Sequence, residues 1–395
     1  MQEIFIQTDD QRAILETVRR FNEEHVTPCA AELDAQVNPE DSFSWEIVEA
    51  AHNIGLRTMT LSEAYGGLGI DSLTTVMVVE ELSHGDMGVA ATLGQTLKLA
   101  RFIENALNDE QKERVLLPFV DDPRGLLAIG ITEPDNASNY IVPYPAASFR
   151  TTAEKVEGGW VVNGMKHFIS NASLASFHLL FAQTNKDKPL TEGSTLFFVE
   201  RGRDGFTIGR VHDKMGERLS CNAEMIFQDC FIPDENVVGD LHNGFQLMAR
   251  FFPSSNAYAA CFVLGVAVAA YEKALDWAKV RVQGGKPLIE HDGIRAQLAE
   301  MKMLIDASRA YAHRAAWLSD HQEHGWDASL GVLPKIMAAQ ATWKIVTWAL
   351  EIHGGHGYMK EAGVEKLVRD AAAYLHSDGG NRSLFLKAAN FMYHD

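Results

Sequence analysis

The chain has 395 residues, 46% of them hydrophobic and 22% charged, which is enough for two or three domains with buried cores. Its 53 acidic residues outnumber its 35 lysines and arginines, so the formal net charge is −18, and such a surface repels nucleic-acid phosphates and anionic lipid. Nucleic acid and membranes are therefore not expected as partners. The four cysteines, which have no CxxC spacing, and an N-terminus without an apolar leader favour a reducing, cytoplasmic compartment.

Residues 1–125 predict an N-terminal all-α domain, because apolar residues recur at helical spacing and no segment alternates as a strand does. Thr8 and Gln11 have the spacing of a capping box, which predicts the start of a helix. Another helix is expected from Trp45 to about Gly55. Three further helices are expected at 73–82, 89–107 and 109–119.

Residues 126–240 predict a β domain. Gly158-Gly159 and Asn163-Gly164 separate short β-prone runs, a pattern typical of hairpins. Further strands are expected at 177–184, 195–200, 207–211 and 224–232. Many short strands at close spacing favour a small antiparallel barrel or sandwich.

Residues 241–395 return to the helical period and predict a C-terminal four-helix-bundle domain, so the fold class is multidomain α+β. An apolar run at 257–270 is too short to span a bilayer and continues into a charged helix. Glycine clusters interrupt this region at 354–357 and 379–380, and Asp378 directly precedes the second. A carboxylate beside bare backbone suits proton chemistry; the alternative is an inter-helix turn in which Asp378 or Asn381 is a helix cap.

Seven short motifs occur in order along the chain: ITEPDNASN at 131–139, VNGMKHFISN at 162–171, KMGER at 214–218, FQD at 227–229, RVQGGKPL at 281–288, IHGGHGY at 352–358 and RDA at 369–371. Together, at these spacings, they resemble the motifs of the acyl-CoA dehydrogenase family over essentially the whole chain. The resemblance implies that FAD lies between the β domain and the C-terminal helices. It also implies α,β-dehydrogenation of an acyl thioester, with electrons passing to an electron-transferring flavoprotein.

The resemblance further assigns residues to FAD. Phe168 takes the place of the family's tryptophan on the flavin ring, and Arg281 reaches the FAD of a neighbouring subunit, which implies a homotetramer (a dimer of dimers) or a hetero-oligomer. The alternatives are that Phe168 is an ordinary core aromatic and that Arg281 is a solvated charge at a helix end. The full set of expected cofactor residues is Ile131, Thr132, Ser138, Phe168, Ser170, Arg281, Gln283, Glu351, Gly354, Gly355, Gly380 and Asn381.

Asp378 occupies the slot in which many family members have a catalytic glutamate, so it is the candidate base that removes the α-proton. The family's other position for a catalytic glutamate aligns with Ser255, and its arginine with Asn256, so no second carboxylate is expected to take over the role. Aspartate is shorter than glutamate by roughly 1.5 Å, so either the substrate or the backbone must lie in a different position. The expected substrate-binding residues are Gln95, Ser138, Asn256 and Gly379.

Two rival functions remain open at this point. One is a flavin oxidase or lyase acting on a nitroalkane or an unusual thioester, and the other is a non-catalytic partner subunit that completes a neighbour's FAD site. No metal is expected, because His353, His356 and His376 lack the spacing of a ligand set. His376 either lines the substrate cavity or is a hydrogen-bonded core histidine.

Overall fold

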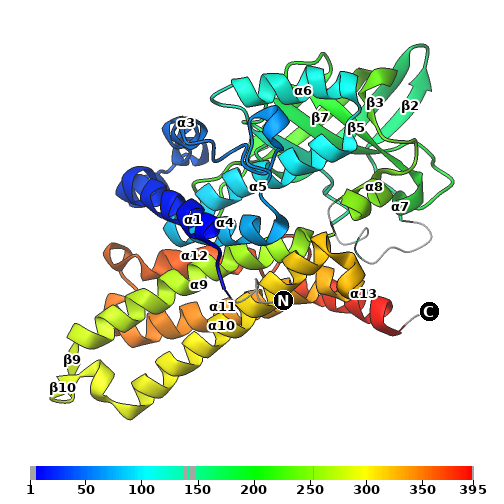
Figure 1. The fold of residues 1–395 in the computed structure, drawn as a ribbon. Helices are drawn as coiled ribbons and strands as arrows, with labels where there is room; N and C mark the ends of the chain where they lie inside the picture. Colours follow the sequence, from blue (N-terminus) through cyan, green and yellow to red (C-terminus); the bar gives the residue numbers. More distant parts are fainter. Residues whose placement is uncertain (1–5, 138–140, 142–146, 252, 394–395) are drawn as a thin grey trace.

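The structure is a computed structural model that describes residues 6–137, 141, 147–251 and 253–393. Helices come first, a sheet follows, and a second set of helices ends the chain (Figure 1). The multidomain α+β architecture predicted from the sequence is confirmed.

In the N-terminal region, residues 6–125 as the structure describes them form six α-helices. They are α1 (Asp9–Phe21), α2 (Thr27–Asp34), α3 (Trp45–Asn53), α4 (Ser72–Gly85), α5 (Met87–Ala106) and α6 (Asp109–Asp121). The capping box is confirmed: the Gln11 amide donates to Thr8 Oγ1 (3.1 Å), and the Thr8 amide donates to Gln11 Oε1 (3.0 Å). A π-helical turn at Asn22–Val26, which the sequence pattern did not predict, joins α1 to α2.

The described residues of the middle region form one hydrogen-bonded network of eight strands. The strands are β1 (Leu127–Gly130), β2 (Thr152–Val156), β3 (Gly159–Ser170), β4 (Phe177–Gln183), β5 (Ser194–Glu200), β6 (Phe206–Val211), β7 (Asn222–Pro233) and β8 (Val237–Val238). Most pairs are antiparallel, as expected, but β1 and the first residue of β2 run parallel to β4. β1 was not predicted, because a four-residue strand buried by its neighbours shows no alternation.

The C-terminal region is a helical bundle. Its helices are α8 (Gly244–Phe251), α9 (Ser255–Val280), α10 (Asp292–Asp320), α11 (Leu333–His353), α12 (Val364–Ala373) and α13 (Asn381–Tyr393). α9 is longer than the predicted apolar run and meets the length and composition of a membrane span, but 67% of its apolar window is buried inside the protein. It is the central helix of the bundle, packed against α4, α10 and α11.

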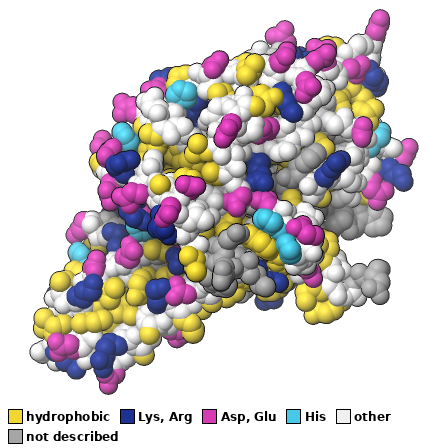
Figure 2. Space-filling view, in the orientation of Figure 1, with side chains coloured by type: hydrophobic (Ala, Val, Ile, Leu, Met, Phe, Trp, Pro, Cys, Tyr) yellow, Lys and Arg dark blue, Asp and Glu magenta, His cyan; other side chains and the backbone are white. Residues whose placement is uncertain are grey.

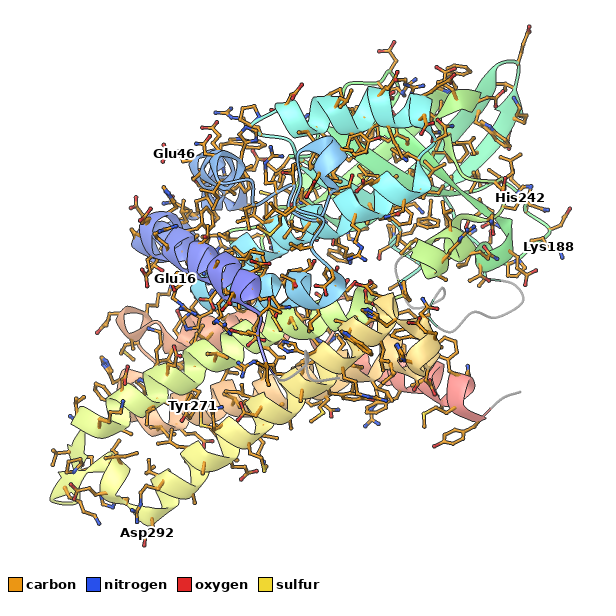
Figure 3. The ribbon with its side chains drawn as sticks, in the orientation of Figure 1. Glu16, Glu46, Lys188, His242, Tyr271 and Asp292 are labelled. Carbon is orange, nitrogen blue, oxygen red and sulfur yellow. The ribbon has the colours of Figure 1, made fainter. Side chains whose placement is uncertain are left out.

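α9 and α10 extend beyond the rest of the molecule as an arm (Figure 1). In Figure 3, Asp292 marks the end of this arm, whereas Lys188 and His242 lie at the opposite end of the molecule. Hydrophobic side chains gather on the arm in the face that Figure 2 shows, and Val280, Val282 and Met303 are exposed there.

One hydrophobic core joins both helical regions and reaches residues of the sheet, including Phe181 and Leu196, while a second core lies within the sheet. The two helical regions are therefore not independent bodies. Because the turn that follows α12 packs at Gly379 against Ile141 of the middle region, the candidate site lies where the middle and C-terminal regions meet.

Candidate active site

Asp378 lies in the turn between α12 and α13. Its backbone has φ +50°, and the following Gly379 has φ +97°, so two left-handed residues in a row reverse the chain. The side-chain amide of Asn256, at the start of α9, donates to the Asp378 carbonyl oxygen (2.9 Å). Asp378 itself is exposed. The structure thus brings together the candidate base and Asn256, a predicted substrate residue.

Gly379 is required by both space and conformation. A Cβ there would lie 2.7 Å from Ile141 Cδ1 and 2.9 Å from Leu384 Cδ2. Ile141 belongs to the middle region, so the turn after α12 touches the segment that follows the first motif. A side chain at Gly379 would push the candidate base away from that segment.

Lys335 of α11 binds the turn through its side chain. Its ammonium donates to the Gly379 carbonyl (2.7 Å) and to Asn381 Oδ1 (2.9 Å). Burial lowers the pKa of Lys335 to about 8, against the attraction of Asp378. Sequence reasoning missed Lys335, which is one of two lysines in α11.

The first motif is fixed to β3 by a buried ion pair. Glu133 and Lys166 are fully buried, with 2.7 Å between Oε1 and Nζ. Lys166 Nζ also donates to the Ile131 carbonyl (3.2 Å), and the His167 amide donates to the Thr132 carbonyl (2.8 Å). The predicted cofactor residues Ile131 and Thr132 therefore have a defined position, whereas Ser138 lies outside the described residues.

Phe168 is the most unusual residue of β3. It has φ +59°, its side chain is 58% exposed, and it sits in a bulge between Lys166 and Ile169. A bulky aromatic in the left-handed region is rare and persists only where its surroundings enforce it. Its ring packs against the rings of His167 and His212, with 4.0 Å and 4.7 Å between the ring centroids. The structure excludes the alternative that Phe168 is a core aromatic.

Asn222 connects Phe168 to Ser170. Its side-chain amide donates to the Phe168 carbonyl (3.2 Å) and to Ser170 Oγ (3.1 Å). An exposed ring with a fixed hydroxyl beside it suits a planar ring that has a polar edge. On this observation the residues fit a flavin.

The other predicted cofactor residues lie elsewhere. Arg281 follows α9, and its guanidinium lies over the Trp277 ring (5.8 Å), which stacks on His353 and His356. Gln283 lies just beyond Arg281 on the same arm. Glu351 is near the end of α11, and Gly354 (φ +59°) and Gly355 follow that helix. These residues form a second group around Trp277.

The two groups lie at opposite ends of α9. Asn256 contacts the Asp378 turn at one end, and Arg281 follows the other, 25 residues later, which is about 37 Å along a helix. The predicted cofactor set is therefore divided within one chain. His353 and His356 are occupied by stacking on Trp277.

Gln95, on α5, is half-buried. Its neighbour Gly94 packs so closely on Phe262 of α9 that a Cβ would lie 2.6 Å from the ring, and Phe262 in turn contacts Tyr374 (5.9 Å between centroids). Gly94, rather than Gln95, thus makes the close contact between α5 and α9.

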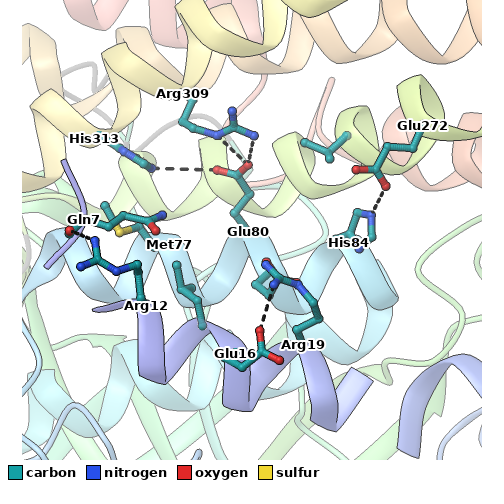
Figure 4. Close-up of a pocket in the computed structure, with 13 residues that line it drawn as sticks. Gln7, Arg12, Glu16, Arg19, Met77, Glu80, His84, Glu272, Arg309 and His313 are labelled. Atoms are coloured by element: carbon teal, nitrogen blue, oxygen red, sulfur yellow. Dashed lines mark hydrogen bonds and ion pairs between the residues drawn. The ribbon is translucent and has the colours of Figure 1, made fainter. Parts of the chain in front are cut away.

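A separate pocket of about 540 Å³ lies between α1, α4, α9 and α10 (Figure 4). Its charges are matched: Arg309 donates to Glu80 (2.6 Å), and His84 lies 2.7 Å from Glu272, whose hydrogen bond raises the pKa of His84. Among the described residues that line it, none belongs to the predicted site. The pocket thus offers no chemistry for the reaction.

Models of three acyl-CoA dehydrogenase domains match the chain: the N-terminal domain at residues 8–122, the middle domain at 128–230 and the C-terminal domain at 242–389. A short-chain specific acyl-CoA dehydrogenase of Megasphaera elsdenii is 34% identical, with 92% of this chain and 93% of that protein covered. Cyclohex-1-ene-1-carbonyl-CoA dehydrogenase of Geobacter metallireducens is 32% identical over the same shares.

Solved structures agree. Butyryl-CoA dehydrogenase from Megasphaera elsdenii superposes with a TM-score of 0.90 at 32% identity, covering 98% of this chain and 99% of that one. A chain from a study of the electron transferring flavoprotein of Acidaminococcus fermentans also gives 0.90, at 28% identity, covering 99% and 100%.

The protein is thus a flavoprotein oxidoreductase of the class that acts on CH–CH groups, with FAD as its cofactor. It belongs to the acyl-CoA dehydrogenase family.

Proposed function

We propose that the protein oxidises an acyl-CoA, or a related carrier-bound acyl thioester, to its enoyl form, and that Asp378 removes the α-proton. The observation that carries the assignment is the position of Asp378, which stands in a left-handed turn against the middle region, in the slot where the family has its glutamate. Bound FAD supplies the acceptor for the β-hydrogen and its electron pair. The names of the relatives support a short or compact acyl group.

The residues of this chain divide the work. Phe168 and Ser170 would hold the flavin ring, and Ile131 and Thr132 its edge. Asn256 binds the carbonyl of Asp378 and Lys335 binds the carbonyl of Gly379, so the backbone that carries the carboxylate is held in place. The backbone N–H groups at the turn are donors that can meet negative charge on the thioester oxygen as the α-proton leaves.

The test is anaerobic reduction of the holoenzyme by butyryl-CoA, octanoyl-CoA or cyclohexenecarbonyl-CoA. The loss of flavin absorbance measures the rate of this reduction. Asp378→Asn is expected to slow it by about 10²–10⁴-fold, the range for loss of a general base, with FAD content unchanged. Asp109→Asn is the matched control, because this fully exposed aspartate at the start of α6 belongs to neither group of site residues. Bleaching of Asp378→Asn at the unaltered rate would contradict the role of Asp378.

We propose that an electron-transferring flavoprotein accepts the electrons. The rival oxidase or lyase is favoured by one observation: Asn256, which stands where the family has an arginine, is committed to the backbone of the base. An oxidase would form hydrogen peroxide in air without a flavoprotein acceptor. A non-catalytic subunit would bind less than one FAD per chain, and its behaviour would not depend on Asp378.

We propose further that copies of the chain share FAD sites. The cofactor group around Arg281 lies about 37 Å from the Asp378 turn, at the end of an arm with exposed Val280 and Val282. Light scattering should show a tetramer. Arg281→Ala should weaken FAD binding without altering the fold of α9, and a monomer that binds FAD fully would refute shared sites.

A further inference from the structure

Two histidines and a glutamate, which the proposed chemistry does not use, bring their side chains together beside Phe168. His167 lies in β3, Glu224 lies in β7, and His212 directly follows β6; these strands are neighbours in the sheet. A ring nitrogen of each histidine and a carboxylate oxygen of Glu224 all lie within 4.8 Å of one another. No spacing in the sequence indicates this group, because the sheet brings its members together from three separate segments.

The Glu224 carboxylate is oriented by the strand beside it. Its Oε2 accepts a hydrogen bond from the Arg210 amide (3.1 Å). A Cβ on Gly209 would lie 2.6 Å from the same oxygen and 2.9 Å from Glu224 Cβ, so a glycine leaves room for Glu224 here. The pairings of β7 with β3 and with β6 both shift register at this level, and such bulges re-aim side chains at sites.

The other carboxylate oxygen faces His167 at the separation expected of two ligands on one ion. Glu224 Oε1 lies 3.4 Å from His167 Nε2, which is long for a hydrogen bond. Two ligands that each lie about 2.0–2.1 Å from a tetrahedral Zn²⁺ are about 3.3–3.4 Å apart. An ion therefore fits between them without rebuilding either strand.

His212 presents a buried nitrogen. The residue is only 6% exposed, and its amide donates to the Asn222 carbonyl (2.8 Å). Its Nδ1 lies 3.3 Å from the Arg210 guanidinium, whereas its Nε2 has no hydrogen-bond partner among the residues that the structure describes. Burying a polar atom without a partner costs free energy, so this nitrogen points to a ligand from outside the chain.

Arg210 is the one competing cation of this group. Its side chain is exposed, so its guanidinium can turn to solvent. The Nδ1 of His212 can then carry the imidazole proton while Nε2 binds a metal, because a neutral imidazole binds through its unprotonated nitrogen.

We propose that His167, His212 and Glu224 form a binding site for one Zn²⁺ ion. Two imidazole nitrogens and one carboxylate oxygen are ligands that Zn²⁺ takes, and three protein ligands leave a fourth position for water. The side chains of His167 and Glu224 are 17% and 19% exposed, so the ion can enter from solvent. The inference concerns a site apart from the Asp378 turn and does not rest on the proposed function.

A bound ion would join three segments of the sheet at the base of the flavin platform. The Phe168 ring packs against the rings of both histidines, so fixing these rings restricts Phe168 as well. A ligand that binds only the folded chain stabilises it. Zn²⁺ should therefore raise the melting temperature of the holoenzyme.

The experiment is calorimetric titration of the chelator-treated holoenzyme with Zn²⁺ at neutral pH, and one ion per chain is expected. His212→Asn and Glu224→Gln should each weaken binding about 100-fold and abolish the rise in melting temperature, since losing even an outer partner of a metal ligand costs about 10–100-fold. His324→Gln is the matched control, because this exposed histidine lies 3.3 Å from Glu323 in a surface pair. It should bind Zn²⁺ as the unaltered enzyme does.

The proposal is overturned if the holoenzyme binds less than one Zn²⁺ per chain, or if both site variants bind as tightly as the control. Excess Mg²⁺, which prefers oxygen ligands, should not compete, and displacement of Zn²⁺ by Mg²⁺ would exclude the two histidines as ligands. If His212→Asn fails to fold, His167→Gln takes its place, because that side chain is partly exposed.

Discussion

The buried pair of Glu133 and Lys166 should be far more sensitive to losing one partner than to losing both. Glu133 accepts hydrogen bonds from Lys166 Nζ (2.7 Å), the Arg150 amide (2.6 Å) and the Thr151 amide (2.9 Å). Lys166 also lies 3.7 Å from the centre of the Phe149 ring. The informative changes are Lys166→Met and Glu133→Gln, which keep volume and remove charge.

The magnitude follows from burial. Desolvation lowers the pKa of Lys166 from 10.5 to about 8 in spite of Glu133. A shift of that size means that holding the lysine charged at neutral pH costs about 3 kcal/mol even with its partner present. Removing one partner of a buried pair typically costs about 3–5 kcal/mol, so each single variant should lose that much. The free energy of unfolding of the double variant should fall by only about 1–3 kcal/mol, because glutamine leaves one backbone N–H without an acceptor.

Urea unfolding of the apoproteins, followed by tryptophan fluorescence, measures these differences. Lys186→Met, in the exposed pair of Lys186 and Glu154, is the control and should leave the urea midpoint unchanged. The reasoning is refuted if the double variant loses the sum of the two singles, or if each single behaves like the control.

Three further outcomes are expected. Gly379→Ala should lose about 1–3 kcal/mol and bleach more slowly, because φ +97° and the Ile141 side chain leave no place for a Cβ; unfolding and bleaching rates check it. Phe168→Ala should weaken FAD binding about tenfold, which is the contribution of one aromatic stack, with little change in stability. An unchanged Kd for FAD in a fluorescence titration would contradict the stacking of Phe168 on the flavin. Lys335 keeps fewer protons folded than unfolded between pH about 8 and 10.5, so stability should rise with pH there. Lys335→Met should reduce that rise in alkaline urea titrations, and a rise of unchanged size would exclude the contribution of Lys335.

Sequence periodicity was sufficient to predict secondary structure where a segment interacts with residues near it in the chain. The capping box at Thr8 and the four strands expected between 177 and 232 are present because they depend on local spacing. β1 has only four residues and is defined by its parallel pairing with β4, about 50 positions later, so no local signal revealed it. The π-helical turn at Asn22–Val26 depends on packing rather than on composition.

The candidate site was predictable only where a motif carried it. Asp378 and Phe168 occur in recognisable sequence motifs, and the structure adds that both have positive φ. Lys335 was missed because its burial depends on its partners, and these follow α12 rather than neighbouring it in sequence.

The turn after α12 illustrates how a short base can serve a site built around a longer one. Asn256 and Lys335 bind the consecutive carbonyl groups of Asp378 and Gly379, and they come from two helices that pack together in the central core. The backbone, rather than the side chain, is thereby placed with precision, and a side chain with one fewer carbon has fewer rotamers to lose on reaching the substrate. The shortfall of roughly 1.5 Å in reach is then a matter of where this turn is held, which depends on the packing of α9 and α11 and on the absence of a Cβ at Gly379.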